Sequence, residues 1–209
     1  MAPTINLSGG QLNTATQGSL GGQRSDTIVV TDVNENFFDD ITRAEGLIGK
    51  TEYRMGYIYN PDATTYAGIT IQLTTNPNLG QVSIGLDPVG KGDGRNTGIG
   101  TTIATEDATP ASVKFFGEEN VDDGAYDTVI IPIGTLKQGE GVPFWLKRKT
   151  EQGTTQVITF NFVIEYFAPT FPGETFDDGG AMGELLKIDI ASAPYVVDTA
   201  RVEFSEVGW

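Results

Sequence analysis

The chain contains neither cysteine nor histidine among its 209 residues. Without cysteine it can form no disulfide, no thiolate nucleophile and no thiolate-ligated zinc site. Without histidine it cannot build the Ser-His-Asp arrangement of many hydrolases. These two absences exclude common routes to nucleophilic catalysis and to transition-metal binding.

Positive charge is scarce as well. Thirteen Lys and Arg residues stand against 28 Asp and Glu residues, which gives a formal net charge of −15. Nucleic-acid binding draws on clustered basic side chains, and an acidic surface repels anionic membranes, so we expect neither partner. The one basic cluster, Lys147-Arg148-Lys149, is typical of a solubilising strand edge beside a hairpin turn.

Long apolar runs are also missing. No stretch approaches the about 20 apolar residues that a membrane-spanning helix needs. Residues 1–6 lack the basic region and the apolar run of a signal peptide. We therefore expect a soluble protein that is made in the cytoplasm.

The sequence is rich in turn residues and in alternating strand patterns. Its 27 glycines and 10 prolines favour short strands over long helices. The clearest pattern runs from Thr51 to Leu73, on both sides of the turn Asn60-Pro61-Asp62. The alternating residues are Tyr53, Met55, Tyr57 and Tyr59 in one half-buried strand, and Ile69, Ile71 and Leu73 in the next. We expect these two strands to pair in a hairpin-like unit.

Other strands are predicted in both directions along the chain. They cover residues 27–33, 82–86, 99–104, 113–116, 128–134, 142–149, 155–167, 184–190 and 195–204. Pro132 indicates an edge strand, because proline cannot donate to a strand ladder. Phe37 and Phe38 are expected to plug one end of the core, and a short helical turn is expected to stop at Gly46.

The predicted fold class is all-β, an antiparallel β-sandwich with an extension at each end. Residues 1–26 form an N-terminal arm, 27–168 the sandwich domain, and 169–209 a C-terminal extension that carries strands. The first arm is either a flexible leader or a segment that orders on a neighbour. The extension is either a final hairpin of the same sandwich or adds strands to a neighbouring subunit. Candidate interface residues are the apolar ones of both extensions, Ile5, Leu7, Leu12, Leu20, Phe171, Phe176, Tyr195, Val197, Phe204 and Trp209.

Acidic residues suggest no catalytic site. The adjacent pairs Asp39/Asp40, Asp122/Asp123 and Asp177/Asp178 point to opposite sides of an extended chain, unlike the facing carboxyls of a glycosidase. In the loop from Asp87 to Gly100, the oxygens of Asp87, Asp93 and Asn96 could bind calcium. The spacing of an EF-hand is absent, however, and a surface loop is the preferred interpretation. We expect no catalytic residue, no cofactor and no enzyme activity.

Aromatic residues offer one binding alternative. A carbohydrate-binding module would need exposed coplanar rings, and the candidates are Trp145, Tyr57, Tyr59 and Trp209. For Trp145 a place in the core or at its rim is the favoured interpretation.

Five segments together resemble a known family. They are Phe37-Phe38-Asp39-Asp40-Ile41-Thr42, Thr51-Glu52-Tyr53-Arg54, Ile84-Gly85-Leu86-Asp87-Pro88, Ile103-Ala104-Thr105-Glu106-Asp107-Ala108-Thr109-Pro110 and Phe144-Trp145-Leu146-Lys147-Arg148. In order and spacing they are similar to a family of tailed-phage virion proteins with an immunoglobulin-like β-sandwich. The similarity spans about residues 37–167. Met55, where the family more often has a small residue or Cys, and the long C-terminal piece depart from the family pattern.

The resemblance implies a non-enzymatic subunit that is present in many symmetric copies in a virion. The two-armed layout favours a capsid decoration or cement protein, whose partners are the major capsid protein or neighbouring virion subunits and which forms a homo-oligomer on the particle. A tail or fibre component that contacts the host surface is the alternative. The carbohydrate-binding module is a second alternative, from another functional class.

Overall fold

The computed structural model describes residues 3–9, 18–29, 37–38, 41–73, 82–117, 129–153, 161–169 and 183–191. Within these ranges the regular structure consists of eleven strands and one short helix. Every pairing between strands is antiparallel. The predicted all-β antiparallel sandwich is therefore confirmed, whereas the immunoglobulin-like topology stays a prediction.

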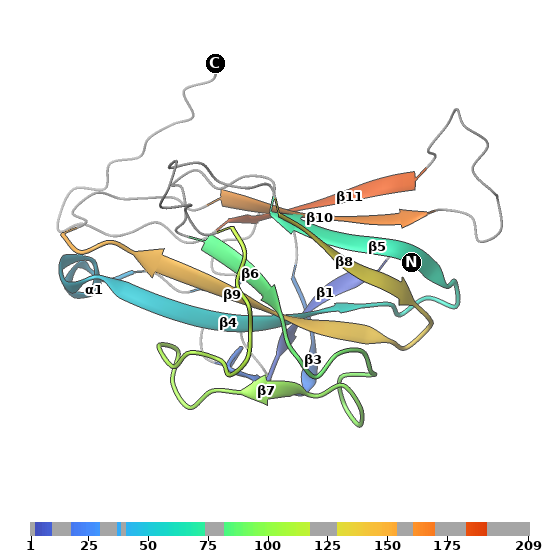
Figure 1. Cartoon of the computed structure of the whole chain (residues 1–209), viewed down its shortest axis with the longest axis horizontal. Coiled ribbons are helices and arrows are strands. Elements are labelled where there is room, and N and C mark those ends of the chain that lie inside the picture. Colours follow the sequence, from blue (N-terminus) through green and yellow to red (C-terminus); the bar gives the residue numbers. More distant parts are fainter. Residues whose placement is uncertain are drawn as a thin grey trace, which may run out of the picture.

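The strands form two main sheets and a small third one (Figure 1). The five-stranded sheet has the order β3 (Arg24–Ile28), β1 (Thr4–Ser8), β4 (Lys50–Tyr59), β9 (Gly141–Thr150), β6 (Val82–Leu86). The four-stranded sheet has the order β11 (Gly183–Ala191), β10 (Asn161–Pro169), β5 (Tyr66–Leu73), β8 (Val129–Leu136). The third consists of β2 (Gly21–Gly22) and β7 (Gly100–Thr102). In Figure 1 the five-stranded sheet is the middle layer, between the four-stranded sheet and the layer that contains β7.

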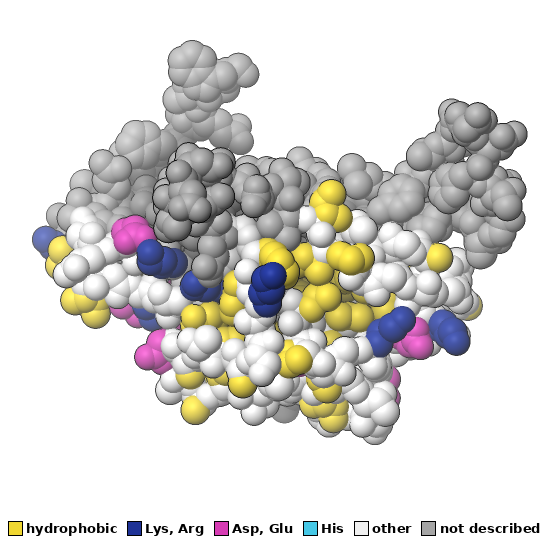
Figure 2. All heavy atoms as spheres, in the orientation of Figure 1, with side chains coloured by type: hydrophobic (Ala, Val, Ile, Leu, Met, Phe, Trp, Pro, Cys, Tyr) yellow, Lys and Arg dark blue, Asp and Glu magenta, His cyan; other side chains and the backbone are white. Residues whose placement is uncertain are grey.

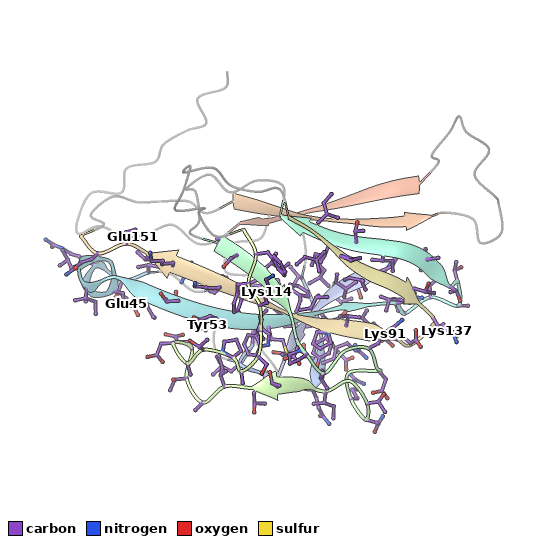
Figure 3. The ribbon with its side chains drawn as sticks, viewed as in Figure 1. Glu45, Tyr53, Lys91, Lys114, Lys137 and Glu151 are labelled. Carbon is purple, nitrogen blue, oxygen red and sulfur yellow. The ribbon has the colours of Figure 1, made fainter. Side chains whose placement is uncertain are left out.

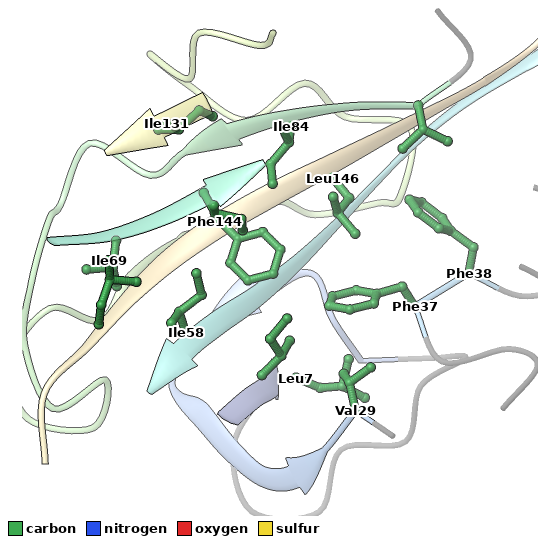
Figure 4. Packing of buried hydrophobic residues seen from close by; sticks show 14 of the residues in the cluster. Leu7, Val29, Phe37, Phe38, Ile58, Ile69, Ile84, Ile131, Phe144 and Leu146 are labelled. Atoms are coloured by element: carbon green, nitrogen blue, oxygen red, sulfur yellow. The ribbon is translucent and has the colours of Figure 1, made fainter. Parts of the chain in front are cut away.

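The main core lies between the two large sheets (Figure 4). Ile58 and Phe144 of the five-stranded sheet pack there with Ile69 of the four-stranded sheet. Phe37 and Phe38 are both 1% exposed, so the prediction that they plug the core is confirmed. Each apolar side chain of this size contributes about 1.5–3 kcal/mol when it is fully buried.

Gly56 of β4 is part of this packing. A Cβ there would lie 2.8 Å from the Phe37 ring and 2.9 Å from the Phe144 ring. The two rings are tilted against each other with their centroids 6.0 Å apart. The strand therefore needs a residue without a side chain at this position.

A second core covers the outer face of the five-stranded sheet. Tyr53, Met55 and Tyr57 of β4 pack there with Trp145 of β9, under Ile103, Val113 and Phe115 of the outer layer. The Tyr57 hydroxyl donates to the Gly22 carbonyl (2.6 Å) and accepts from the Gly100 amide (2.7 Å), which ties β2 and β7 to β4. The shared face predicted for the alternating residues is thus confirmed, but β4 is buried on both faces and the prediction of a half-buried strand is wrong.

The predicted pairing of β4 with β5 is wrong. β4 pairs with β1 and β9, and β5 pairs with β8 and β10 in the other sheet. Asn60 supports the crossing between sheets, because its buried side-chain amide donates to the carbonyls of Thr64 (2.8 Å) and Leu136 (3.1 Å). β9 and β10 likewise lie in different sheets, so the basic cluster does not flank a hairpin.

The N-terminal boundary also needs correction. β1 and β3 are strands of the five-stranded sheet, and Ile5 and Leu7 are at most 1% exposed in the main core. The described parts of residues 1–26 therefore belong to the sandwich rather than to a separate arm. The strand predicted over residues 27–33 ends at Ile28 as far as the described residues show, and begins earlier, at Arg24.

Other predictions have mixed outcomes. β6 is confirmed, and β8 with Pro132 is an outer strand of its sheet as predicted. The strand predicted over 184–190 is confirmed as β11, which pairs with β10 over nine residues, whereas its predicted hairpin partner at 195–204 lies outside the described ranges. Of the strand expected over 113–116, only Phe116 forms a bridge, with Ile84.

The helix differs in its end point. Helix α1 (Arg43–Ile48) begins with a capping box between Thr42 and Glu45 and contains Gly46 in its middle. It ends at Gly49, whose φ of 77° lies in the left-handed region that favours glycine. No helix in the described ranges has the length and apolar character needed to cross a membrane.

Candidate functional site: a charge network beside a surface groove

A shallow groove of about 770 Å³ opens where α1 meets the start of β4 and the turn at residues 105–107. It is lined by Leu20, Glu45, Ile48, Gly49, Lys50, Thr51, Arg54, Thr105, Glu106 and Asp107. Ile48 is 73% exposed at its lip. Four of the lining residues, Glu45, Lys50, Arg54 and Glu106, belong to one network of ion pairs.

Lys50 is the centre of this network. Its ammonium nitrogen contacts one carboxylate oxygen each of Glu45, of Glu52 (3.0 Å) and of Glu106 (2.6 Å). Three carboxylates thus surround one amine, and the ammonium group takes the position that a bound cation would take.

The network continues into the sandwich. Arg148 of β9 pairs with Glu52 opposite it on β4, with its Nε 2.9 Å from the carboxylate, and both side chains are at most 1% exposed. The Arg148 guanidinium lies 4.6 Å from the centre of the Phe38 ring. Arg54 donates to Glu106 across 2.6 Å. Three acidic and three basic residues therefore neutralise one another.

Local structure brings these side chains together. Lys50, Glu52 and Arg54 are spaced by two along β4, so they share a face. The capping box of α1 fixes Glu45, whose carboxylate accepts from the Thr42 amide (2.8 Å). Glu106 is held because the Tyr53 amide donates to its carbonyl across 2.7 Å.

The ionisation of the network argues against acid–base catalysis. Burial acts to lower the pKa of Lys50, but hydrogen bonds to the three carboxylates outweigh it and raise that pKa above its usual value. Burial acts to raise the pKa of Glu45 and Glu106, but hydrogen bonds, chiefly from Lys50, outweigh it and lower both pKa values. All three groups therefore stay charged at neutral pH, whereas a general acid or base works best near its own pKa.

The proposed calcium loop is held together by its own donors. Asp87 is buried and accepts from Trp145 Nε1 (2.9 Å) and Thr101 Oγ1 (2.6 Å). The Asp93 carboxylate accepts from the Thr97 amide, from the side chain and amide of Asn96 and from the Arg95 amide, and these bonds lower its pKa. Asp87 and Asp93 thus bind different partners, and within the described ranges no group of three or more Asp and Glu residues is arranged to hold a metal ion.

The aromatic candidates lie mainly inside the protein. Trp145 and Tyr57 are both fully buried, so the core interpretation of Trp145 is confirmed and neither ring can serve as an exposed platform for a sugar. Tyr59 is partly buried, and the Arg24 guanidinium lies 3.6 Å from the centre of its ring. Trp209 lies outside the described residues.

The interface candidates are divided between core, groove and undescribed segments. Ile5 and Leu7 belong to the main core, and Leu20 is half-buried in the lining of the groove. The others lie outside the described residues, namely Leu12, Phe171, Phe176, Tyr195, Val197, Phe204 and Trp209.

The basic cluster is not a solubilising edge. β9 lies between β4 and β6, and the central residue of the cluster, Arg148, is fully buried. Lys149 pairs with Glu151 (2.6 Å), and the Lys147 amine lies 6.0 Å from the centre of the Phe115 ring.

The sequence analysis did not predict the ion network. Its signal was the alternating charge of Lys50, Glu52 and Arg54 on the same strand face as the buried residues Gly56 and Ile58.

The segments that carry the family resemblance meet in this region. Four of the five segments contribute to the network. They supply its members Glu52, Arg54, Glu106 and Arg148, and also Phe38, whose ring packs against Arg54 and Arg148. The fifth segment supplies Asp87, which bonds to the indole of Trp145. The five segments therefore contribute contacts that hold the fold together.

No protein-family model and no curated protein matches the chain. Among solved structures it is similar to the N-terminal domain of PorA, with a TM-score of 0.40 and 14% identity over 93% of this chain and 97% of that one. It is also similar to a family 123 glycoside hydrolase from Clostridium perfringens, with a TM-score of 0.30 and 10% identity over 72% of this chain and 22% of that one. At these scores neither similarity supports an assignment of family or function.

Proposed function

We propose that the chain is a non-enzymatic structural subunit of a tailed-phage particle, with capsid decoration as its role. The observation that carries this proposal is the position of the five segments similar to phage virion proteins. They supply the Glu52–Arg148 and Arg54–Glu106 pairs of the ion network and the Asp87–Trp145 bond, which connect distant parts of the fold. What the chain shares with that family is thus a scaffold rather than a reactive site.

The chemistry of the groove supports the non-enzymatic part of the proposal. Lys50 has a raised pKa and is charged, so it is a poor nucleophile or base. Glu45 and Glu106 have lowered pKa values and are ionised, so neither can act as a general acid at neutral pH.

The surface supports a role in assembly. Exposed isoleucines occur at separate places, with Ile48 on α1 and Ile130 on β8. Figure 2 shows acidic and basic side chains next to one another at both ends of this face, with hydrophobic side chains between them. Such a mixed surface suits contacts with several protein neighbours better than it suits one charged ligand.

Cryo-electron microscopy of particles from cells that carry the gene tests the proposal. We expect density for this β-sandwich on the icosahedral shell. Density on the tail instead would favour the tail or fibre alternative, and absence of the chain from purified particles would contradict both.

The enzyme class can be tested separately with purified protein. Hydrolysis of a glycan or ester substrate that disappears in Glu106→Gln or Glu45→Gln, while the variant stays folded, would contradict the non-enzymatic assignment. We expect no turnover by the wild-type protein or by either variant.

A further inference from the structure

The first half of β4 has no strand beside it on the side away from β9. β9 pairs with β4 along its whole length, whereas β1 pairs with only the last four residues of β4. Beyond β1, the Met55 amide donates to the Ser19 carbonyl across 2.7 Å. The Tyr53 amide, the next one on this side, donates to the Glu106 carbonyl across 2.7 Å. Two loops thus take the place of a strand as far as Tyr53.

Thr51 is the next residue whose backbone points to this side, because the residues of a strand bond alternately to its two neighbours. The amide and the carbonyl of Thr51 have no hydrogen-bond partner within the described ranges. The Tyr53 carbonyl is covered, since Arg54 donates to it across 3.2 Å. One donor and one acceptor of β4 are therefore open, and Thr51 lines the groove beside α1. So short an opening can hold one extended segment but cannot pair with the edge of another sheet.

The charges that solvent reaches in the groove are mainly acidic. Glu45 and Glu106 expose 27% and 32% of their side chains. The basic groups lie deeper, with 16% of the Lys50 side chain and 2% of the Arg54 side chain exposed. Asp107 adds a third exposed carboxylate to the lining. A ligand that enters the groove therefore meets negative charge first.

Apolar side chains lie beside these carboxylates. Ile48 is 73% exposed and Leu20 is half-buried, and both line the groove. Figure 3 shows Glu45 on α1 and Tyr53 further along β4, and the groove lies along β4 between them. A Lys or Arg side chain, with an aliphatic stem and a positive end, matches both kinds of group.

We infer that the groove is a docking site for an extended segment of a partner protein that carries a Lys or Arg side chain. The backbone of the segment bonds to the amide and carbonyl of Thr51. The aliphatic stem of its basic residue packs on Ile48 and Leu20, and the positive end meets the carboxylates of Glu106 and Asp107. This inference does not depend on the assignment to a phage particle.

The contact is small. It consists of two backbone hydrogen bonds, one apolar stem and charge contacts that are open to solvent, and each of these contributes little on its own. An isolated short peptide should therefore bind with a dissociation constant of about 1 mM. Within a larger interface the same contact would mainly fix the orientation of the partner.

An NMR titration of the full-length, ¹⁵N-labelled protein with the blocked pentapeptide Thr-Val-Lys-Val-Thr tests this inference. We expect saturable shifts of the Thr51 amide and of the other residues of the groove. The peptide with Glu in place of Lys should bind about tenfold more weakly at low salt. N-methylation should weaken binding about threefold or more at every second peptide residue only, because alternate amides face β4.

Variants of the protein identify the groove as the site. Asp107→Asn should weaken binding of the Lys peptide about two- to fivefold at low salt, and less at high salt. Asp107→Lys should reduce the preference for the Lys peptide over the Glu peptide about tenfold. Asp26→Asn removes a carboxylate with 64% of its side chain exposed on β3 and should leave the affinity unchanged. The amide spectra of the free variants show whether each one is folded.

The inference has clear contradicting outcomes. It fails if the Thr51 amide does not shift at peptide concentrations up to about 10 mM, or if the Lys and Glu peptides bind equally well. It also fails if Asp107→Lys keeps the wild-type preference, or if N-methylation has no effect at any position. The shifts would then reflect a general attraction between a basic peptide and a chain with a net charge of −15.

Discussion

Arg148 carries a buried charge in the interior of the sandwich. Its guanidinium pairs with Glu52, and neither side chain is more than 1% exposed. Replacing Arg148 with Met leaves the Glu52 carboxylate buried, with Lys50, 3.0 Å away, as its one remaining charged partner among the described residues. We expect the free energy of unfolding to fall by about 3–5 kcal/mol, measured by urea denaturation.

The matched control for this change is its neighbour Lys149. Lys149→Met removes the same charge from a side chain that is 49% exposed and should change stability by less than about 1 kcal/mol. The double variant Glu52→Met/Arg148→Met should recover part of the loss, because it leaves no unpaired carboxylate. Equal losses of unfolding free energy in Arg148→Met and Lys149→Met would show that breaking the buried Glu52–Arg148 pair costs no more than removing an exposed charge.

Substitution of Trp145 distinguishes a role of this residue in the core from a role in sugar binding. It is fully buried against Tyr57 and Met55, and its indole donates to Asp87. Trp145→Ala should lower the free energy of unfolding by about 3–5 kcal/mol in denaturant titrations. Ile130→Ala, at an exposed position, serves as the control and should cost less than about 1 kcal/mol. A Trp145→Ala variant that keeps wild-type stability but loses binding to a glycan would instead favour the carbohydrate-binding alternative.

At the scale of elements, the Lys50 network joins α1, β4 and the turn at 105–107, and it makes this junction sensitive to acid. Glu45 and Glu106 have folded pKa values below the usual 4.5. A lowered folded pKa stabilises the protein above the unfolded pKa, and this stabilisation is lost as the pH falls through the folded value. We therefore expect the free energy of unfolding to decrease from about pH 5 downward.

The measurement is a set of urea titrations between pH 7 and pH 3. In Glu106→Gln the decrease should be shallower than in the wild type, because one of the two groups no longer titrates. Glu151→Gln removes an equal charge from a side chain that is 61% exposed and should retain the wild-type slope. An unchanged slope in Glu106→Gln would contradict a role of the network in acid stability.

The strands also show which structural facts the sequence could predict. Period-two alternation identified the shared face of Tyr53, Met55 and Tyr57 in β4, because side-chain direction is a local property of an extended chain. The partner of a strand is not local. The turn at Asn60 is compatible with a hairpin, yet the Asn60 amide binds the carbonyls of Thr64, in the loop before β5, and of Leu136, in β8 of the other sheet. The pairing of β4 with β1 and β9 depends on contacts far apart in the sequence.

The candidate site was difficult to predict for a similar reason. Glu106 lies 52 positions beyond Arg54, and Arg148 lies 96 positions beyond Glu52. The composition indicates that the charged side chains lie in solvent, which is the usual position of Lys and Glu. In this structure Lys50 and Glu52 are buried or partly buried, and their ion pairs make that burial possible. Ile5 and Leu7 were assigned to an arm because their flanking residues are polar, but the sheet supplies the apolar neighbours that the segment itself lacks.

At the scale of the whole molecule, charge is unevenly divided along the sequence. Twelve of the 13 basic residues and 13 of the 28 acidic residues lie in the described ranges, so these ranges are nearly neutral. The acidic excess belongs to the remaining segments. Repulsion among like charges opposes compact states and is screened by salt, whereas buried pairs such as Glu52–Arg148 are screened much less.

We therefore expect salt to stabilise the protein at neutral pH. The free energy of unfolding should rise between low ionic strength and about 0.15 M, where the Debye length is about 8 Å, and should then level off. Thermal and urea unfolding in NaCl and in KCl measure the effect, and equal results in the two salts assign it to screening rather than to binding of one ion. A fall in stability with salt would mean that exposed ion pairs such as Arg95–Asp26 outweigh the repulsion.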